Sequence, residues 1–136
     1  MKNGSFKKIK AVSALGTALA AIIIAFACIC PTALLRGLKR ETERDSEECI
    51  RAVLADDPAR AAMLLSDIRE TLLKYRSQLL TTFDHDEIEE LFYAVDTAYE
   101  LALAGDKAQL LTELTAFRTK LEFLLYTNRA GLENLL

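Results

Sequence analysis

The sequence contains no tryptophan, a single histidine, five scattered glycines and two prolines among its 136 residues. No glycine-rich loop is therefore available to hold a phosphate group. A zinc site needs three or four ligands, and no second histidine is present to join the single one. No serine or cysteine lies in a recognisable nucleophile motif. We therefore expect no enzymatic activity and no cofactor.

Cysteine is also scarce, with three in the whole chain. Cys28 and Cys30 lie in an apolar stretch, so only Cys49 is left for the region that follows, and one cysteine makes no disulfide framework. We expect Cys28 and Cys30 to act as small apolar residues, with acylation or redox chemistry as the alternative. For Cys49 we expect packing in a core, with an intermolecular disulfide as the alternative.

Charge is missing from residues 11–35, and acidic charge is missing from residues 1–10. The first ten residues instead carry four lysines: Lys2, Lys7, Lys8 and Lys10. From Arg36 onward, 13 lysines and arginines stand against 20 aspartates and glutamates, a net charge of −7. Nucleic-acid binding needs a basic face that displaces counterions, so we expect no nucleic-acid partner.

The uncharged stretch is long enough to cross a bilayer. At about 1.5 Å per residue, residues 11–35 form a helix of roughly 37 Å, against about 30 Å for the hydrocarbon core. We predict a transmembrane anchor over 11–35, which attaches the protein to a membrane. A cleaved signal peptide with the small-residue site Ala25-Phe26-Ala27 is one alternative, and lipidation at Cys28 is the other.

The charges beside the stretch bear on its orientation. Four lysines and the α-amino group precede it, while Arg36, Lys39, Arg40 and Arg44 follow, so the local balance is nearly even. Because the N-terminal tail is short and the following region is acidic, we predict that residues 1–10 are cytoplasmic. The C-terminal domain is then extracytoplasmic, in a single-pass protein of the cell membrane. The reverse orientation is the alternative.

Beyond the anchor the pattern is helical throughout, which predicts an all-α protein. Residues 36–57 are mostly polar and predict a stalk or first helix. Residues 58–136 predict a helical bundle domain, in which short connections between long helices make neighbours antiparallel. With the first segment the bundle has three to four helices.

The starts and ends of these helices are also marked in the sequence. Asp57-Pro58 is a typical helix start, and Asp84 and Asp106 are expected to cap the next two helices. Gly105 is a typical residue just beyond a helix end. The last helix is predicted to end between Asn128 and Gly131. Apolar residues three and four apart form one face of each helix, with Tyr75, Tyr93, Tyr99 and Tyr126 expected at the edge of the core.

His85 lies between Asp84 and Asp86, which makes these three residues weak candidates for a metal site. The glycine and spaced ligands of a calcium loop do not follow them. An acidic helix start also has a purely structural explanation, because the helix dipole favours negative charge there. A membrane-anchored ligand- or metal-sensing domain that uses this acidic patch is our alternative function.

The order of these features resembles a known family. A lysine-rich start and one span precede Phe83-Asp84-His85-Asp86-Glu87-Ile88, a Gly105-Asp106 turn and a closing Leu132-Glu133-Asn134-Leu135-Leu136. The chain resembles small bacterial membrane-anchored proteins catalogued only as a domain of unknown function. The resemblance implies a single-pass helical protein with no assigned reaction or cofactor. We expect a membrane-tethered interaction or scaffold protein that binds an unknown protein partner or itself.

Overall fold

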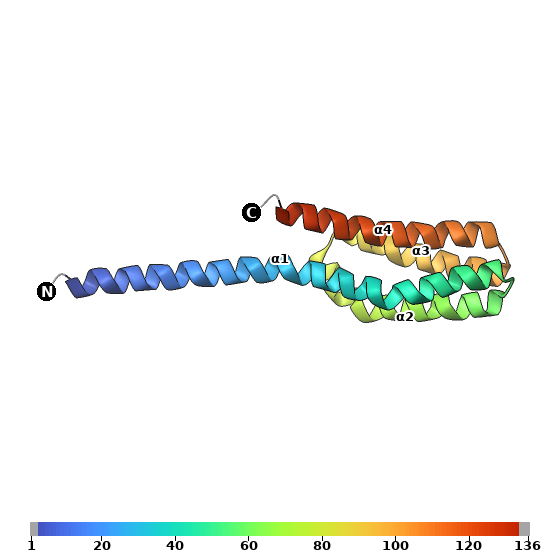
Figure 1. The fold of residues 1–136 in the computed structure, drawn as a ribbon, viewed down its shortest axis with the longest axis horizontal. Helices are drawn as coiled ribbons and strands as arrows, with labels where there is room; N and C mark the ends of the chain where they lie inside the picture. The colour runs from blue at the N-terminus through green and yellow to red at the C-terminus, as the bar shows by residue number, and fades with distance from the viewer. Residues whose placement is uncertain (1–2, 134–136) are drawn as a thin grey trace. The chain divides into compact units, whose positions relative to one another are not determined.

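The computed structural model describes the backbone of residues 3–133 and the side chains of residues 11–27 and 29–131. Over this part of the chain every regular element is a helix (Figure 1), which confirms the all-α class. The four helices are α1 (Asn3–Leu54), α2 (Pro58–Thr82), α3 (His85–Ala104) and α4 (Lys107–Glu133). The chain divides into an N-terminal unit, residues 1–31, and a C-terminal unit, residues 32–136, and Pro31 lies inside α1 at the division.

Helices α2, α3 and α4 begin where the sequence predicts. The carboxylate of Asp57 accepts a hydrogen bond from the backbone N–H of Arg60 at 3.0 Å, and Pro58 occupies the first turn of α2. Asp106 accepts a similar bond from Gln109 at 3.1 Å. Each satisfies an N–H that the first helical turn leaves without a partner.

The backbone conformation at the end of α3 explains why a glycine, Gly105, follows the helix. Gly105 has a φ of 77°, in the left-handed region that a residue without Cβ adopts without strain. Its N–H bonds to the carbonyls of Leu101 and Ala102, which closes the helix. At the other end of the chain, α4 continues to Glu133, beyond the predicted end between Asn128 and Gly131.

Within the C-terminal unit, residues 32–54 of α1 lie beside both α2 and α4, and α3 lies beside α2 and α4 (Figure 1). Contacts between side chains fix the directions, because rising numbers on one helix meet falling numbers on its neighbour. These contacts are Thr32–Asn128 and Lys39–Glu122, Glu41–Tyr75 and Glu48–Arg60, and Arg69–Asp96 and Arg76–Glu89. Each of these three pairs of helices is therefore antiparallel, which short connections explain for the two pairs that are consecutive in the chain, α1–α2 and α2–α3.

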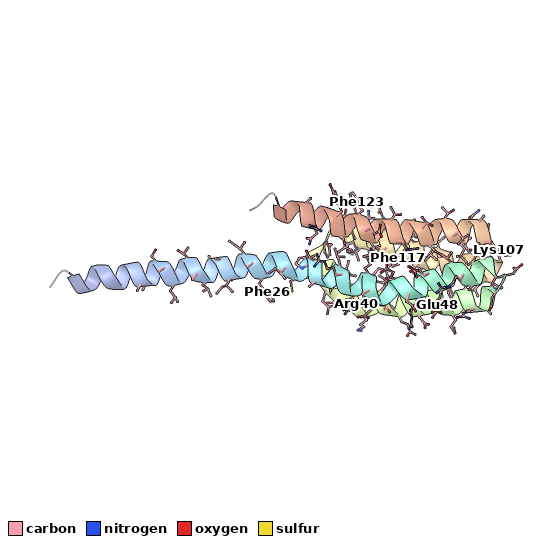
Figure 2. The ribbon with its side chains drawn as sticks, viewed as in Figure 1. Phe26, Arg40, Glu48, Lys107, Phe117 and Phe123 are labelled. Atoms are coloured by element: carbon pink, nitrogen blue, oxygen red, sulfur yellow. The ribbon has the colours of Figure 1, made fainter. Side chains whose placement is uncertain are left out.

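One hydrophobic core joins the four helical segments. Phe117 of α4, labelled in Figure 2, is 1% exposed and is the largest fully buried side chain. The buried positions of α2, α3 and α4 follow the predicted stripes closely, including Leu65, Val95 and Leu114. Leu73 of α2, although apolar, is exposed.

Residues 36–57, predicted from the sequence to be a polar stalk or first helix, contribute side chains to this core. Cys49 and Val53 are buried as expected, but so are Thr42 and Ser46. Thr42 satisfies its hydroxyl by donating to the carbonyl of Leu38 at 3.0 Å, one turn back in the same helix. Because polar residues occupy two core positions, the apolar stripe of this segment looks sparse in the sequence.

The end of the uncharged stretch belongs to the C-terminal unit too. Leu35, assigned to the anchor from the sequence, is fully buried in this unit, and so is Leu38. The segment that lies outside the core therefore covers residues 11–31 in place of 11–35. At about 1.5 Å per residue its length is roughly 31 Å, close to the ~30 Å of a hydrocarbon core.

Candidate functional site

The largest exposed apolar surface lies on residues 11–30. Every described side chain from 11 to 27 is exposed, and the large apolar ones are 59% to 73% exposed. They are Val12, Leu15, Leu19, Ile22, Ile23, Ile24 and Phe26, followed by Ile29. Among the described residues, one helix is long and apolar enough to cross a membrane, judged by length and composition, and it contains this segment. A helix that is apolar all round needs an apolar environment on every side.

The acidic patch around His85 lies at the start of α3. Asp84 uses a carboxylate oxygen to accept a hydrogen bond from the N–H of Asp86 at 2.9 Å, so it caps the helix as predicted. The Nε2 of His85 lies 3.9 Å from the carboxylate of Glu89, one turn further on. Over the described side chains, no group of three or more histidine, cysteine, aspartate or glutamate residues is placed to hold a metal ion.

The three cysteines have different surroundings. The side chain of Cys28, the weak lipidation candidate, lies outside the described residues. Cys30 is an exposed free thiol in the apolar segment. Cys49 is fully buried, with its sulfur 3.7 Å from the carbonyl oxygen of Ala61, and burial raises the pKa of its thiol to about 11. A buried thiol with a raised pKa is a poor nucleophile.

A charged cluster joins α1 to α2. The hydroxyl of Tyr75 donates a hydrogen bond to Glu41 at 2.5 Å, and Lys74 pairs with the same carboxylate at 3.2 Å. These bonds lower the pKa of Glu41, while the carboxylate raises the pKa of Tyr75. Gly37 lies next to this hydroxyl, and a Cβ at Gly37 would be 3.5 Å from it. The cluster ties two helices together on the surface and has no free reactive group.

An open hollow lies between α3 and α4, and its lining is mainly apolar. It is lined by Tyr93, Ala94, Ala116, Thr119 and Phe123, together with the charged residues Glu90, Glu113 and Lys120. Both aromatic side chains are largely exposed, although large apolar side chains normally gain free energy from burial. The ion pair between Lys120 and Glu90 crosses the same surface.

Sequence periodicity did not find this hollow. Tyr93 and Tyr126 were expected at the edge of the core, but they are 69% and 71% exposed, whereas Tyr75 and Tyr99 are partly buried as expected. The sequence carries one weak indication that Tyr93 is exposed. Tyr93 follows Phe92, and because adjacent residues of a helix point about 100° apart, only one of these two side chains enters the core. The hollow itself depends on how two helices pack.

No family model matches the chain, and neither a curated protein nor a solved structure is significantly similar to it. The features of the chain that bear on function are therefore the exposed apolar segment, the core of the C-terminal unit and the hollow between α3 and α4.

Proposed function

We propose that the protein is a membrane-tethered helical interaction module, without catalytic activity. In this proposal residues 11–31 are a retained transmembrane anchor, and residues 32–136 form an antiparallel four-helix bundle that binds a protein partner or a second copy. The observation that carries the proposal is the contrast in exposure between the two units. One exposes nearly all its apolar side chains, and the other buries most of them.

The anchor follows from the cost of exposing that surface to water. Each fully buried leucine, isoleucine or phenylalanine gains about 1.5–3 kcal/mol over an exposed one, and the segment presents eight exposed large apolar side chains. No described polar or charged face covers them. A bilayer supplies the missing apolar environment over a matching length of about 30 Å.

The interaction role follows from the C-terminal unit. Its core is complete, so the tether is not needed to stabilise it. It presents the aromatic hollow between α3 and α4, with Tyr93 and Phe123, and no described cluster of reactive groups. Aromatic residues in a small-residue hollow are typical anchors for a partner's side chains. The acidic patch at His85 has the simpler role of capping α3.

The orientation belongs to the same proposal: residues 1–10 are cytoplasmic and the acidic C-terminal unit is outside. The lysines before the span support it through the positive-inside rule.

Photo-crosslinking in intact membranes tests the interaction role. A photoreactive amino acid in place of Tyr93 would lie in the hollow, and the same group in place of Leu54 would be equally exposed on another part of the unit. We expect a discrete protein adduct from position 93 and none from position 54. A chain that gives no protein adduct from position 93, or the same adducts from both positions, contradicts the interaction role.

A second experiment tests orientation and retention of the anchor. Cys49 is a poor labelling site because it is buried, so we suggest Leu54→Cys, a position 73% exposed. A membrane-impermeant thiol reagent should label this variant in intact cells, at the size of the uncleaved chain. The parent chain, which keeps Cys49, is the matched control. Labelling only after the cells are opened indicates the reverse orientation, and a shortened product indicates signal cleavage.

A further inference from the structure

The outer face of α4 carries a stripe of uncharged side chains. Six of them are exposed and the last is partly buried: Gln109, Thr112, Ala116, Thr119, Phe123, Tyr126 and Ala130. Their spacing alternates between three and four residues, which keeps them on one side of the helix. At about 1.5 Å per residue the stripe is roughly 32 Å long. α4 therefore has two faces without charge, one in the core and one in solvent.

The same alternation defines the positions at which one helix of a coiled coil meets another. Thr112, Ala116 and Thr119 in the first half of the stripe are small. Phe123 and Tyr126 in the second half are large, and they are 50% and 71% exposed. If two copies of α4 pack antiparallel, the large half of each stripe lies against the small half of the other. Size therefore favours the antiparallel pair, because large side chains against small ones fill the space between two helices.

Two charged residues at one edge of the stripe favour the same arrangement. Glu113 and Lys120 lie two helical turns apart, and both line the hollow between α3 and α4. In one register of the antiparallel pair, Ala116 lies against Thr119 of the second copy. The same register brings Glu113 beside Lys120 of the second copy, and the symmetry of the pair gives this contact twice. In a parallel pair Glu113 and Lys120 lie beside uncharged residues of the second copy.

The surroundings of both charges leave room for this contact. Over the described side chains, Glu113 makes no ion pair. Lys120 bonds to Glu90 across the hollow, and because its ammonium group has three N–H donors it can bond to a second carboxylate. The α4 of the second copy would also fill the hollow and cover Tyr93, which is 69% exposed. A second copy therefore matches the size, the apolar surface and the charges of this face.

We propose that the hollow between α3 and α4 binds a second copy of the chain, with the two α4 helices antiparallel around a two-fold axis between Ala116 and Thr119. This dimer rests on the proposed interaction role of the hollow, for which it names the partner. Both copies use the same surface, so the contact closes after two molecules and does not extend into a filament.

Single cysteines on the stripe test the arrangement in the full-length chain, in mild detergent. The two copies of Ala116 would be offset by three residues, about 4.5 Å along the helices, and the two copies of Thr112 by eleven residues, about 16 Å. Ala116→Cys and Thr112→Cys, at two exposed positions, are therefore a matched pair for a short bifunctional thiol reagent. Cys28 and Cys30 are replaced by alanine in both variants, and Cys49 stays because it is buried. The chain with these two replacements alone is the control for Cys49.

We expect a covalent dimer from Ala116→Cys and its loss in Thr112→Cys. Equal dimer from both positions indicates parallel or random contact, and no dimer from either shows that α4 does not pair; both results overturn the dimer. In that case the photoreactive group in place of Tyr93 separates this failure from that of the proposed function. If it captures a different protein, the interaction role stands with another partner, and if it captures none, the interaction role fails as well.

Charge reversal gives a second test in the Ala116→Cys chain. Glu113→Lys and Lys120→Glu each turn two attractive contacts into repulsive ones, which should lower the dimer yield by about fivefold or more. A mixture of the two variants restores opposite charges at both contacts, so the mixed dimer should recover the parent yield. Glu100→Lys, an exposed reversal on α3, is the control, and circular dichroism checks that each variant folds. A mixed dimer no more abundant than the dimer of either variant alone overturns the antiparallel pairing.

Discussion

Phe26 and Phe117 are the same side chain in two regions of the molecule, 70% exposed in the N-terminal unit and 1% exposed in the C-terminal unit (Figure 2). Both lie in helices that contain several leucines and alanines. The difference is in spacing: the stretch around Phe26 has no charged residue on any face, whereas Phe117 belongs to a stripe with polar residues between its members. Apolar content makes a helix insoluble in water, but only a stripe makes a core.

This comparison also separates two sources of stability. The C-terminal unit gains its stability from water leaving its own side chains. In the function proposed above, the N-terminal unit gains its stability from the surrounding lipid. Substitutions in one unit should therefore affect folding, and substitutions in the other should affect attachment to the membrane.

The largest effect is expected at the core. Phe117→Ala removes the largest fully buried side chain and leaves a cavity, which should lower the free energy of unfolding by about 3–5 kcal/mol. Phe26→Ala, its counterpart in the exposed segment, should change it by less than about 0.5 kcal/mol. Denaturant titration of the full chain in mild detergent, followed by circular dichroism, measures both. Equal losses would show that the two units fold as one.

A charge placed in the apolar segment should weaken membrane attachment and leave the stability of the C-terminal unit unchanged. Ile23→Arg places an arginine near the middle of the segment, which costs about 2.5–3.5 kcal/mol of membrane insertion. The C-terminal unit should keep its stability. The fraction of chain retained in membranes after alkaline extraction measures the loss, with the exposed Leu103→Arg as control. Full retention of Ile23→Arg would count against a spanning segment.

Much of the C-terminal unit could be predicted from sequence because local signals agreed with the packing. Asp57, Asp84 and Gly105 mark helix ends through chemistry that acts within one turn, and these predictions are confirmed. Spacing of three and four residues gave the buried faces of α2, α3 and α4. Such features need no knowledge of distant contacts.

The part of α1 in the C-terminal unit shows where that reasoning stops. Leu35 and Leu38 sit at the end of an apolar run, and nothing local shows that the core takes them. Thr42 and Ser46 are buried by contact with other helices, which their own polarity does not indicate. The hollow at Tyr93 has the same limit, because it is formed by the packing of α3 against α4.

Cys49 should give an intermediate effect that depends on pH. Its thiol has a pKa of about 11 in the folded chain, above the value of 9.0 expected without burial. A raised folded pKa means that the stability it contributes is complete below pH 9 and is lost as the pH rises toward 11. The stability difference between the parent and Cys49→Ala should therefore shrink by roughly 2 kcal/mol over that window.

Denaturant titrations of both chains at several pH values measure this, and the difference between chains removes the contribution of lysine and tyrosine titration. Thiol-reagent kinetics give a second readout, since Cys49 should react only after unfolding while Leu54→Cys reacts in the folded chain. A difference that stays constant from pH 8 to about 11 would contradict a buried thiol.

The smallest effect is expected at the start of α3, where capping and metal binding make different demands on the same residues. Asp84→Ala removes the acceptor for the N–H of Asp86 and should lower the free energy of unfolding by about 1 kcal/mol. His85→Ala removes an exposed side chain and should change it by less than about 0.5 kcal/mol. Melting temperatures with and without divalent ions separate the two roles. If zinc raised the melting temperature of the parent and His85→Ala abolished the rise, the turn would bind metal, and capping alone would no longer explain its acidic residues.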